Sequence, residues 1–153
     1  WLILDHYQLQ TIVYIRCNVS LLLRFVNKDY FMSWNKHEAV SYARSHAHHN
    51  STGYCARAVA AAIRAGGLKI DGADAKNFWR SLEKAGFSKV YGTPIEGDVA
   101  VIDALPGAHQ NGHACIYDGS GTWYSDFKQN SLYPGQTYRK IQPKITPLQA
   151  LLI

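Results

Sequence analysis

The chain has 153 residues, of which 47% are hydrophobic and 18% charged. This length suits one domain, and the composition excludes general disorder because it can build an apolar core. The net charge is +5, but the basic residues form no block or stripe, which argues against a nucleic-acid partner. The three cysteines have no regular spacing and no CxxC pair, so they indicate neither a disulfide framework nor a zinc site.

The first 31 residues are richer in apolar and β-branched side chains than the rest of the chain. Their strongest apolar runs are 11–15 and 21–23. Arg16 and Arg24 interrupt the apolar stretch, so it is a poor membrane span, and no small-residue cleavage site marks a signal peptide. We therefore expect no membrane insertion.

The single methionine, Met32, precedes a sequence that looks like a natural start. This predicts three parts: an N-terminal extension outside the catalytic fold over 1–31, one catalytic domain over 32–143, and a C-terminal tail over 144–153.

A first helix is predicted where Asn35 and Glu38 form a capping box. Three histidines, His46, His48 and His49, lie near its end. They suit the negative end of a helix dipole better than a metal site, since no carboxylate or cysteine joins them at ligand spacing. The apolar positions of this helix recur at helical spacing: Ala39, Val40, Ala43 and Ala47.

A second, alanine-rich helix is predicted from Cys55, with the stop signal at Gly66. Ser51 or Thr52 is the candidate N-cap. A thiol in the first turn of a helix feels the positive end of the macrodipole, which favours the nucleophilic thiolate. The alternative is that Cys55 is a small buried apolar residue.

A third helix is predicted from an N-cap at Asp74 to a stop at Gly86. Beyond it the pattern becomes strand-like. The expected strands are 89–91, 97–102, 113–117, 122–125 and 137–141. Helices followed by an antiparallel meander predict an α+β domain, with the N-terminal helices packed on a small antiparallel sheet.

Three residues in this arrangement could carry nucleophilic chemistry. A thiol nucleophile needs a base, and the base needs a third group to orient it. Cys55 opens a helix and His113 opens a strand. A hairpin turning at 118–121 would return Asp126 to the side of His113, where its carboxylate could fix the imidazole tautomer.

Four motifs in this order resemble the CHAP and NlpC-type papain-like amidases. The chain is most similar to the small amidase effectors of type VI secretion and to related phage lysins, from about Met32 to Lys140. In the second motif the family's Asp, here Asp98, is usually structural. The motifs are Gly-Tyr-Cys-Ala-Arg at 53–57, Gly-Asp-Val-Ala-Val-Ile at 97–102, Gly-His-Ala-Cys-Ile-Tyr-Asp-Gly at 112–119 and Trp-Tyr-Ser-Asp-Phe-Lys-Gln at 123–129.

The resemblance implies a cysteine peptidase or amidase that hydrolyses amide bonds in peptidoglycan stem peptides. Cys55 matches the nucleophile, His113 the general base and Asp126 the third member of the triad. The backbone N–H of Cys55 would stabilise the oxyanion, with Tyr54 or Asn50 as a second donor. This chemistry needs no metal or organic cofactor.

The resemblance also implies a bacteriolytic effector or lysin that acts outside the cytoplasm, in the periplasm or cell wall of a target bacterium. An immunity protein is then an expected partner.

Several alternatives stay open at this point. His109 is a rival base, and Cys115 could join Cys55 and His113 in a metal site, although a buried apolar role for Cys115 explains it better. The same triad could also serve a protease, deamidase or acyltransferase with another substrate. A non-catalytic module that binds envelope polymers would instead use the aromatic set Trp123, Tyr124, Tyr133 and Tyr138.

Overall fold

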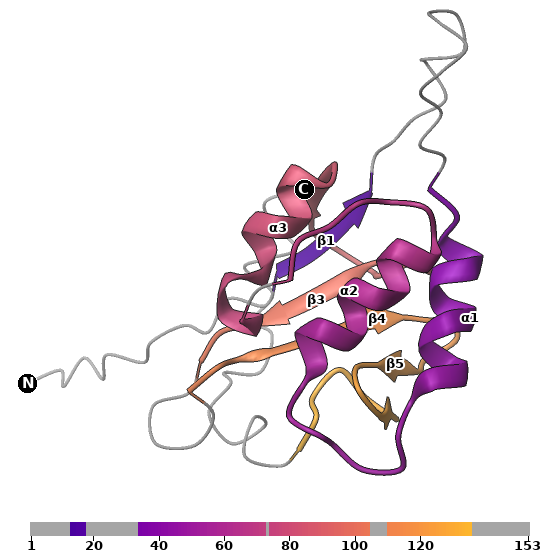
Figure 1. The fold of residues 1–153 in the computed structure, drawn as a ribbon, viewed down its shortest axis with the longest axis vertical. Coiled ribbons are helices and arrows are strands. Elements are labelled where there is room, and N and C mark those ends of the chain that lie inside the picture. The colour runs from indigo at the N-terminus through magenta and orange to yellow at the C-terminus, as the bar shows by residue number, and fades with distance from the viewer. Residues whose placement is uncertain (1–12, 18–33, 73, 105–109, 136–153) are drawn as a thin grey trace, which may run out of the picture.

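A computed structural model describes residues 13–17, 34–72, 74–104 and 110–135. Helices pack on an antiparallel sheet of six strands, which confirms the predicted α+β class (Figure 1). The helices are α1 (Lys36–His46), α2 (Cys55–Ala65) and α3 (Phe78–Lys84), the last preceded by the short 3-10 helix η2 (Ala75–Asn77). The strands are β1 (Val13–Cys17), β2 (Phe87–Val90), β3 (Val99–Ile102), β4 (His113–Tyr117), β5 (Trp123–Tyr124) and β6 (Lys128–Gln129).

The first two helices follow their sequence signals. The side chain of Asn35 caps α1 by accepting a hydrogen bond of 3.1 Å from the backbone N–H of Glu38. Helix α2 begins at Cys55 and ends before Gly66, whose N–H donates to the carbonyl of Ala62 at 3.0 Å. The N-cap position of α2 is Tyr54, without a side-chain cap. The predicted capping residues Ser51 and Thr52 instead donate hydrogen bonds to Asp126.

The strand order in the sheet is β2-β1-β3-β4-β5-β6, and every neighbouring pair is antiparallel. Strand β1 lies inside the sheet: Tyr14 is opposite Val90 on one side and Ala100 on the other. This differs from the prediction that residues 1–31 form an extension outside the catalytic fold. The rest of that segment, the expected strand at 137–141 and the expected tail lie outside the described residues.

An ion pair joins β1 to the site of the second sequence motif. The guanidinium of Arg16 donates from Nε and Nη2 to the two carboxylate oxygens of Asp98, each at 2.9 Å. The N–H of Ile95 adds a third bond of 2.9 Å. Asp98 is fully buried; a carboxylate removed from water needs such partners, so its role is structural.

The main core lies between the helices and one face of the sheet. It joins apolar residues of α1, α2 and α3 to Ile15, Val99 and Ile116. On the other face, Ala100, Cys115 and Trp123 form a smaller cluster. No helix in the described part of the chain is both long and apolar enough to cross a bilayer.

Candidate active site

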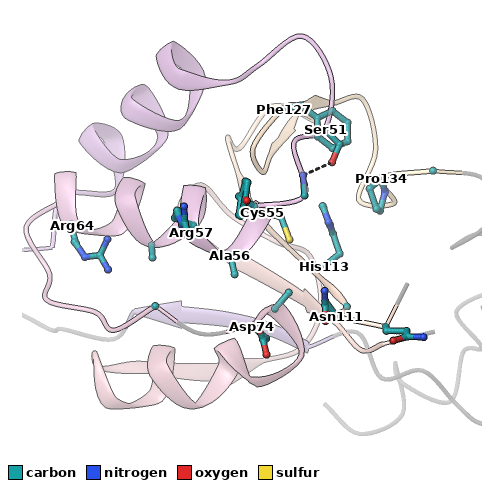
Figure 2. A pocket seen from close by; sticks show the side chains of 18 residues that line it. Ser51, Cys55, Ala56, Arg57, Arg64, Asp74, Asn111, His113, Phe127 and Pro134 are labelled. Carbon is teal, nitrogen blue, oxygen red and sulfur yellow. Dashed lines mark hydrogen bonds between the residues drawn. The ribbon is translucent and has the colours of Figure 1, made fainter. Parts of the chain in front are cut away.

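Cys55 and His113 line the same cleft, which has a volume of about 760 Å³. Cys55 is the first residue of α2 and His113 the first residue of β4. In Figure 2 the sulfur of Cys55 and the ring of His113 point toward one another. The structure thus brings together the two residues that the sequence predicts as nucleophile and base.

The environment of the Cys55 thiol opposes ionisation overall. Burial is the main cause of its raised pKa, and the negative charge of Asp126 adds to it. The backbone N–H groups of Ala114, Ala56 and Cys55 itself act in the opposite direction. Burial thus acts against the thiolate that the helix dipole was expected to favour, so a base beside the thiol would assist its ionisation.

The ring of His113 is held by Gln129, the last residue of the fourth motif, to which the sequence predictions gave no role. Nε2 of His113 and Oε1 of Gln129 are 2.8 Å apart, and both residues are buried. The amide nitrogen of Gln129 donates to the carbonyls of Ser131 and Leu132 at 3.3 and 3.2 Å. Because carbonyls only accept, these bonds fix the amide so that its oxygen faces His113. Nε2 must then carry the ring hydrogen, which leaves Nδ1 as the basic nitrogen.

Asp126 holds the segment that leads into α2. Its Oδ2 accepts hydrogen bonds from the hydroxyls of Ser51 and Thr52 at 3.3 and 2.9 Å, and from the backbone N–H of Thr52. Oδ1 is buried and, among the residues that the structure describes, has no hydrogen-bond partner. The carboxylate is thus not hydrogen-bonded to His113, which differs from its predicted place in the triad. The prediction that Asp126 acts in catalysis is otherwise untested.

The register of the β4–β5 hairpin explains this difference. Ile116 is opposite Tyr124 and Tyr117 is opposite Trp123. Continued along the strands, this register sets Asp126 opposite Ala114, whose side chain is on the other face of the sheet from that of His113. The chain leaves the ladder after Tyr124 and turns Asp126 toward the 48–52 segment, where its carbonyl accepts from the N–H of His48 at 2.8 Å.

The same register places Gln129 on the face of His113. In the β5–β6 pair Gln129 is opposite Trp123, and Trp123 is in turn opposite Tyr117. Tyr117 is four residues from His113 in one strand, so these side chains share a face. Gln129 ends the fourth motif, but an uncharged side chain gives no reason in a single sequence to prefer it over Asp126 as the partner of His113.

The other candidates contribute less to the site. Cys115 is buried beside Ala100 and Trp123, as an apolar residue would be. Within the described ranges no three His, Cys, Asp or Glu side chains form a group that could hold a metal ion. Tyr54 lines the cleft and Asn50 does not. The rival base His109 and the aromatic Tyr138 lie outside the described residues.

Comparison with known proteins identifies the family. No family model and no curated protein matches the chain. The type VI native effector-immunity complex Tae3-Tai3 from Ralstonia pickettii is similar, with 44% identity, a TM-score of 0.67, and coverage of 72% of this chain and 94% of that one. The selenomethionine form of the complex gives 45% identity, a TM-score of 0.63, and coverage of 70% and 95%. The chain belongs to the Tae3 family of type VI effectors.

Membership of the Tae3 family confirms the predicted resemblance to type VI effectors. The wider assignment to CHAP and NlpC-type enzymes stays a prediction. Both similar structures are complexes of a Tae3 effector with an immunity protein, so a partner of that kind is known for this family.

Proposed function

We propose that this Tae3-family protein is a cysteine amidase that hydrolyses amide bonds in peptidoglycan stem peptides. The observation that carries the proposal is the Cys55 thiol facing the His113 ring in an open cleft. The family membership supports the substrate, since the motifs of the chain resemble those of type VI amidase effectors.

The catalytic cycle uses two residues directly. Nδ1 of His113 takes the proton of Cys55 as the sulfur attacks the amide carbonyl. The resulting oxyanion would lie near the backbone N–H groups of Cys55 and Ala56, at the N-terminus of α2. The protonated ring then gives its proton to the leaving amine, and water hydrolyses the thioester in a second round of base catalysis.

Gln129 acts in this scheme as a positioning residue. By accepting from Nε2–H it makes Nδ1 the basic nitrogen of the ring. It also stabilises the imidazolium less than a carboxylate would, because an amide oxygen carries no full charge. This fits a site whose burial raises the pKa of the Cys55 thiol and in which the proton moves during attack.

Asp126 fits better as an anchor of the nucleophile's loop than as the third member of a triad. Its bonds to Ser51 and Thr52 hold the chain immediately before Cys55. Its charge raises the pKa of Cys55, an effect that would hinder a thiolate–imidazolium pair.

We further propose that the protein is an interbacterial toxin that acts in the periplasm or cell wall of a target bacterium, and that an immunity protein inhibits it. The immunity complexes of the similar effectors support this proposal.

A digest of whole sacculi tests the proposed reaction. Wild type should release new muropeptides that mass spectrometry identifies by the bond cut, and Cys55→Ala should release none. Cys17→Ala is the matched control, because Cys17 lies at the end of β1 and does not line the cleft. Equal product patterns from wild type and Cys55→Ala would overturn the proposal.

A further inference from the structure

The cleft extends well beyond the Cys55–His113 pair, along the side of α2. Its walls there are made of small residues that leave room for a ligand. Ala56 and Ala60 come from α2, and Gly72, Ala75 and Gly112 come from the segments opposite. This part of the cleft is therefore open to an extended substrate on one side of the nucleophile.

Two arginines line this groove. Arg57 and Arg64 are seven residues apart on α2, so they lie on one side of the helix, separated by about 10 Å along its axis. Figure 2 shows Arg57 next to the Cys55 end of α2 and Arg64 at its far end. Among the described residues that line the cleft, Asp74 is the one carboxylate, and it lies on the facing wall. The groove therefore has an excess of positive charge.

Both guanidinium groups are held in place without a carboxylate partner. Cζ of Arg57 lies 4.5 Å from the centre of the Tyr54 ring, a cation–π contact that uses none of its N–H donors. Arg64 donates from Nε and Nη2 to the carbonyl of Ile70 at 3.2 and 2.9 Å. Among the described residues, neither forms a salt bridge.

We propose that this groove is a carboxylate-binding subsite, which selects acidic peptides by placing a free carboxylate of the substrate on Arg57, with Arg64 adding attraction further along α2. A guanidinium presents paired donors that match a carboxylate, so orientation by Tyr54 gives specificity as well as charge. The inference rests on the proposed function, because it assigns the substrate class of the same active site.

Alkylation of Cys55 tests the subsite without any peptidoglycan. Iodoacetate and iodoacetamide have the same leaving group and nearly the same size, but only the first carries a carboxylate. In both reactions the thiolate forms a C–S bond and iodide leaves with the electron pair. Mass spectrometry of the peptide containing Cys55 gives both rates, and their ratio cancels the reactivity of the thiol itself.

We expect Arg57→Gln to lower the iodoacetate-to-iodoacetamide ratio about three- to fivefold at low salt, and 0.5 M salt to shrink the difference. Arg57→Lys should restore part of the ratio, and Asp74→Asn should raise it about twofold. Arg80→Gln is the control, since Arg80 stacks on Trp79 outside the cleft. An equal ratio in wild type and Arg57→Gln would overturn the subsite.

Hydrolysis separates failure of the subsite from failure of the proposed function. With muropeptides that differ only in a free or amidated carboxyl group, wild type should show a KM about five- to tenfold lower for the acid, and Arg57→Gln should abolish the preference. If both forms are hydrolysed with equal KM, the subsite proposal fails and the amidase proposal stands. If neither is hydrolysed, the amidase proposal fails, and the alkylation ratio still decides whether the groove binds carboxylates.

Discussion

Asp126 and Gln129 are three residues apart and equally buried, with 2% and 3% of their surface exposed, yet they support different halves of the active site. Asp126 binds Ser51 and Thr52, which lead into the helix of the nucleophile. Gln129 binds the ring of His113, the base on the sheet. The difference shows that the face of the sheet, and not the charge of the side chain, decides which residue orients the imidazole.

The largest expected effect comes from removing the base that Gln129 holds. His113→Ala should lower kcat/KM on muropeptides by at least about 10⁴-fold, because His113 is the proposed base that takes the proton of the sulfur. His46→Ala is the control, since His46 is exposed at the end of α1 and stacks on Tyr42. Substantial activity in His113→Ala would mean that another base, such as His109, serves the reaction.

The second effect concerns Gln129 itself. Gln129→Ala should lower kcat about 10- to 100-fold with little change in KM, because the ring loses its fixed tautomer while the cleft stays open. Steady-state kinetics with Asn130→Ala as the exposed neighbouring control measures this. An unaltered kcat would remove Gln129 from the mechanism.

Replacing Asp126 should move the pH profile of Cys55 alkylation in the opposite direction from the loss of a triad carboxylate. Its charge raises the pKa of Cys55, so Asp126→Asn should move the pH profile of Cys55 alkylation to lower pH. A carboxylate that stabilised the imidazolium would, when removed, move the profile to higher pH. Asp118→Asn should leave the profile in place, since Asp118 binds Ser120 and Thr122 in the hairpin turn. An upward shift in Asp126→Asn would restore Asp126 to the triad.

The smallest effect is on acid stability. Burial acts to raise the pKa of Asp126, but the hydrogen bonds from Thr52 outweigh it, and the pKa is lowered overall. A lowered pKa gives stability that is present above the unfolded value of about 3.9 and is lost as the pH falls through the folded value. Asp126→Asn should therefore cost about 1–3 kcal/mol at pH 6, and the difference from wild type should shrink toward pH 3. Urea unfolding at several pH values measures this, and a constant difference would contradict it.

The sequence predicted those parts of the fold that depend on local signals. The Asn35 cap, the Gly66 stop and the strand of 113–117 all have their cause within a few residues, and each is found in the structure. The meeting of Cys55 and His113 followed from the fold class and from the position of each residue at the start of its element.

Features set by distant pairing were not predictable in the same way. Strand β1 is inside the sheet because its partners are β2 and β3, 70 or more residues away. The ion pair of Arg16 with Asp98 is equally remote. For Asp126 the hairpin turn alone did not fix the pairing, and a shift of one residue moves a side chain to the other face of a sheet.

The proposed mechanism requires the hydrogen of His113 to be on Nε2, which leaves Nδ1 as the nitrogen that takes the proton of Cys55. Long-range ¹H–¹⁵N NMR of the imidazole at pH 7.5, with His113→Gln to assign the signals, reports this directly. We predict a neutral ring with hydrogen on Nε2 in wild type, and loss of that single tautomer in Gln129→Ala. A ring with hydrogen on Nδ1 alone would contradict the proposed base and the role of Gln129.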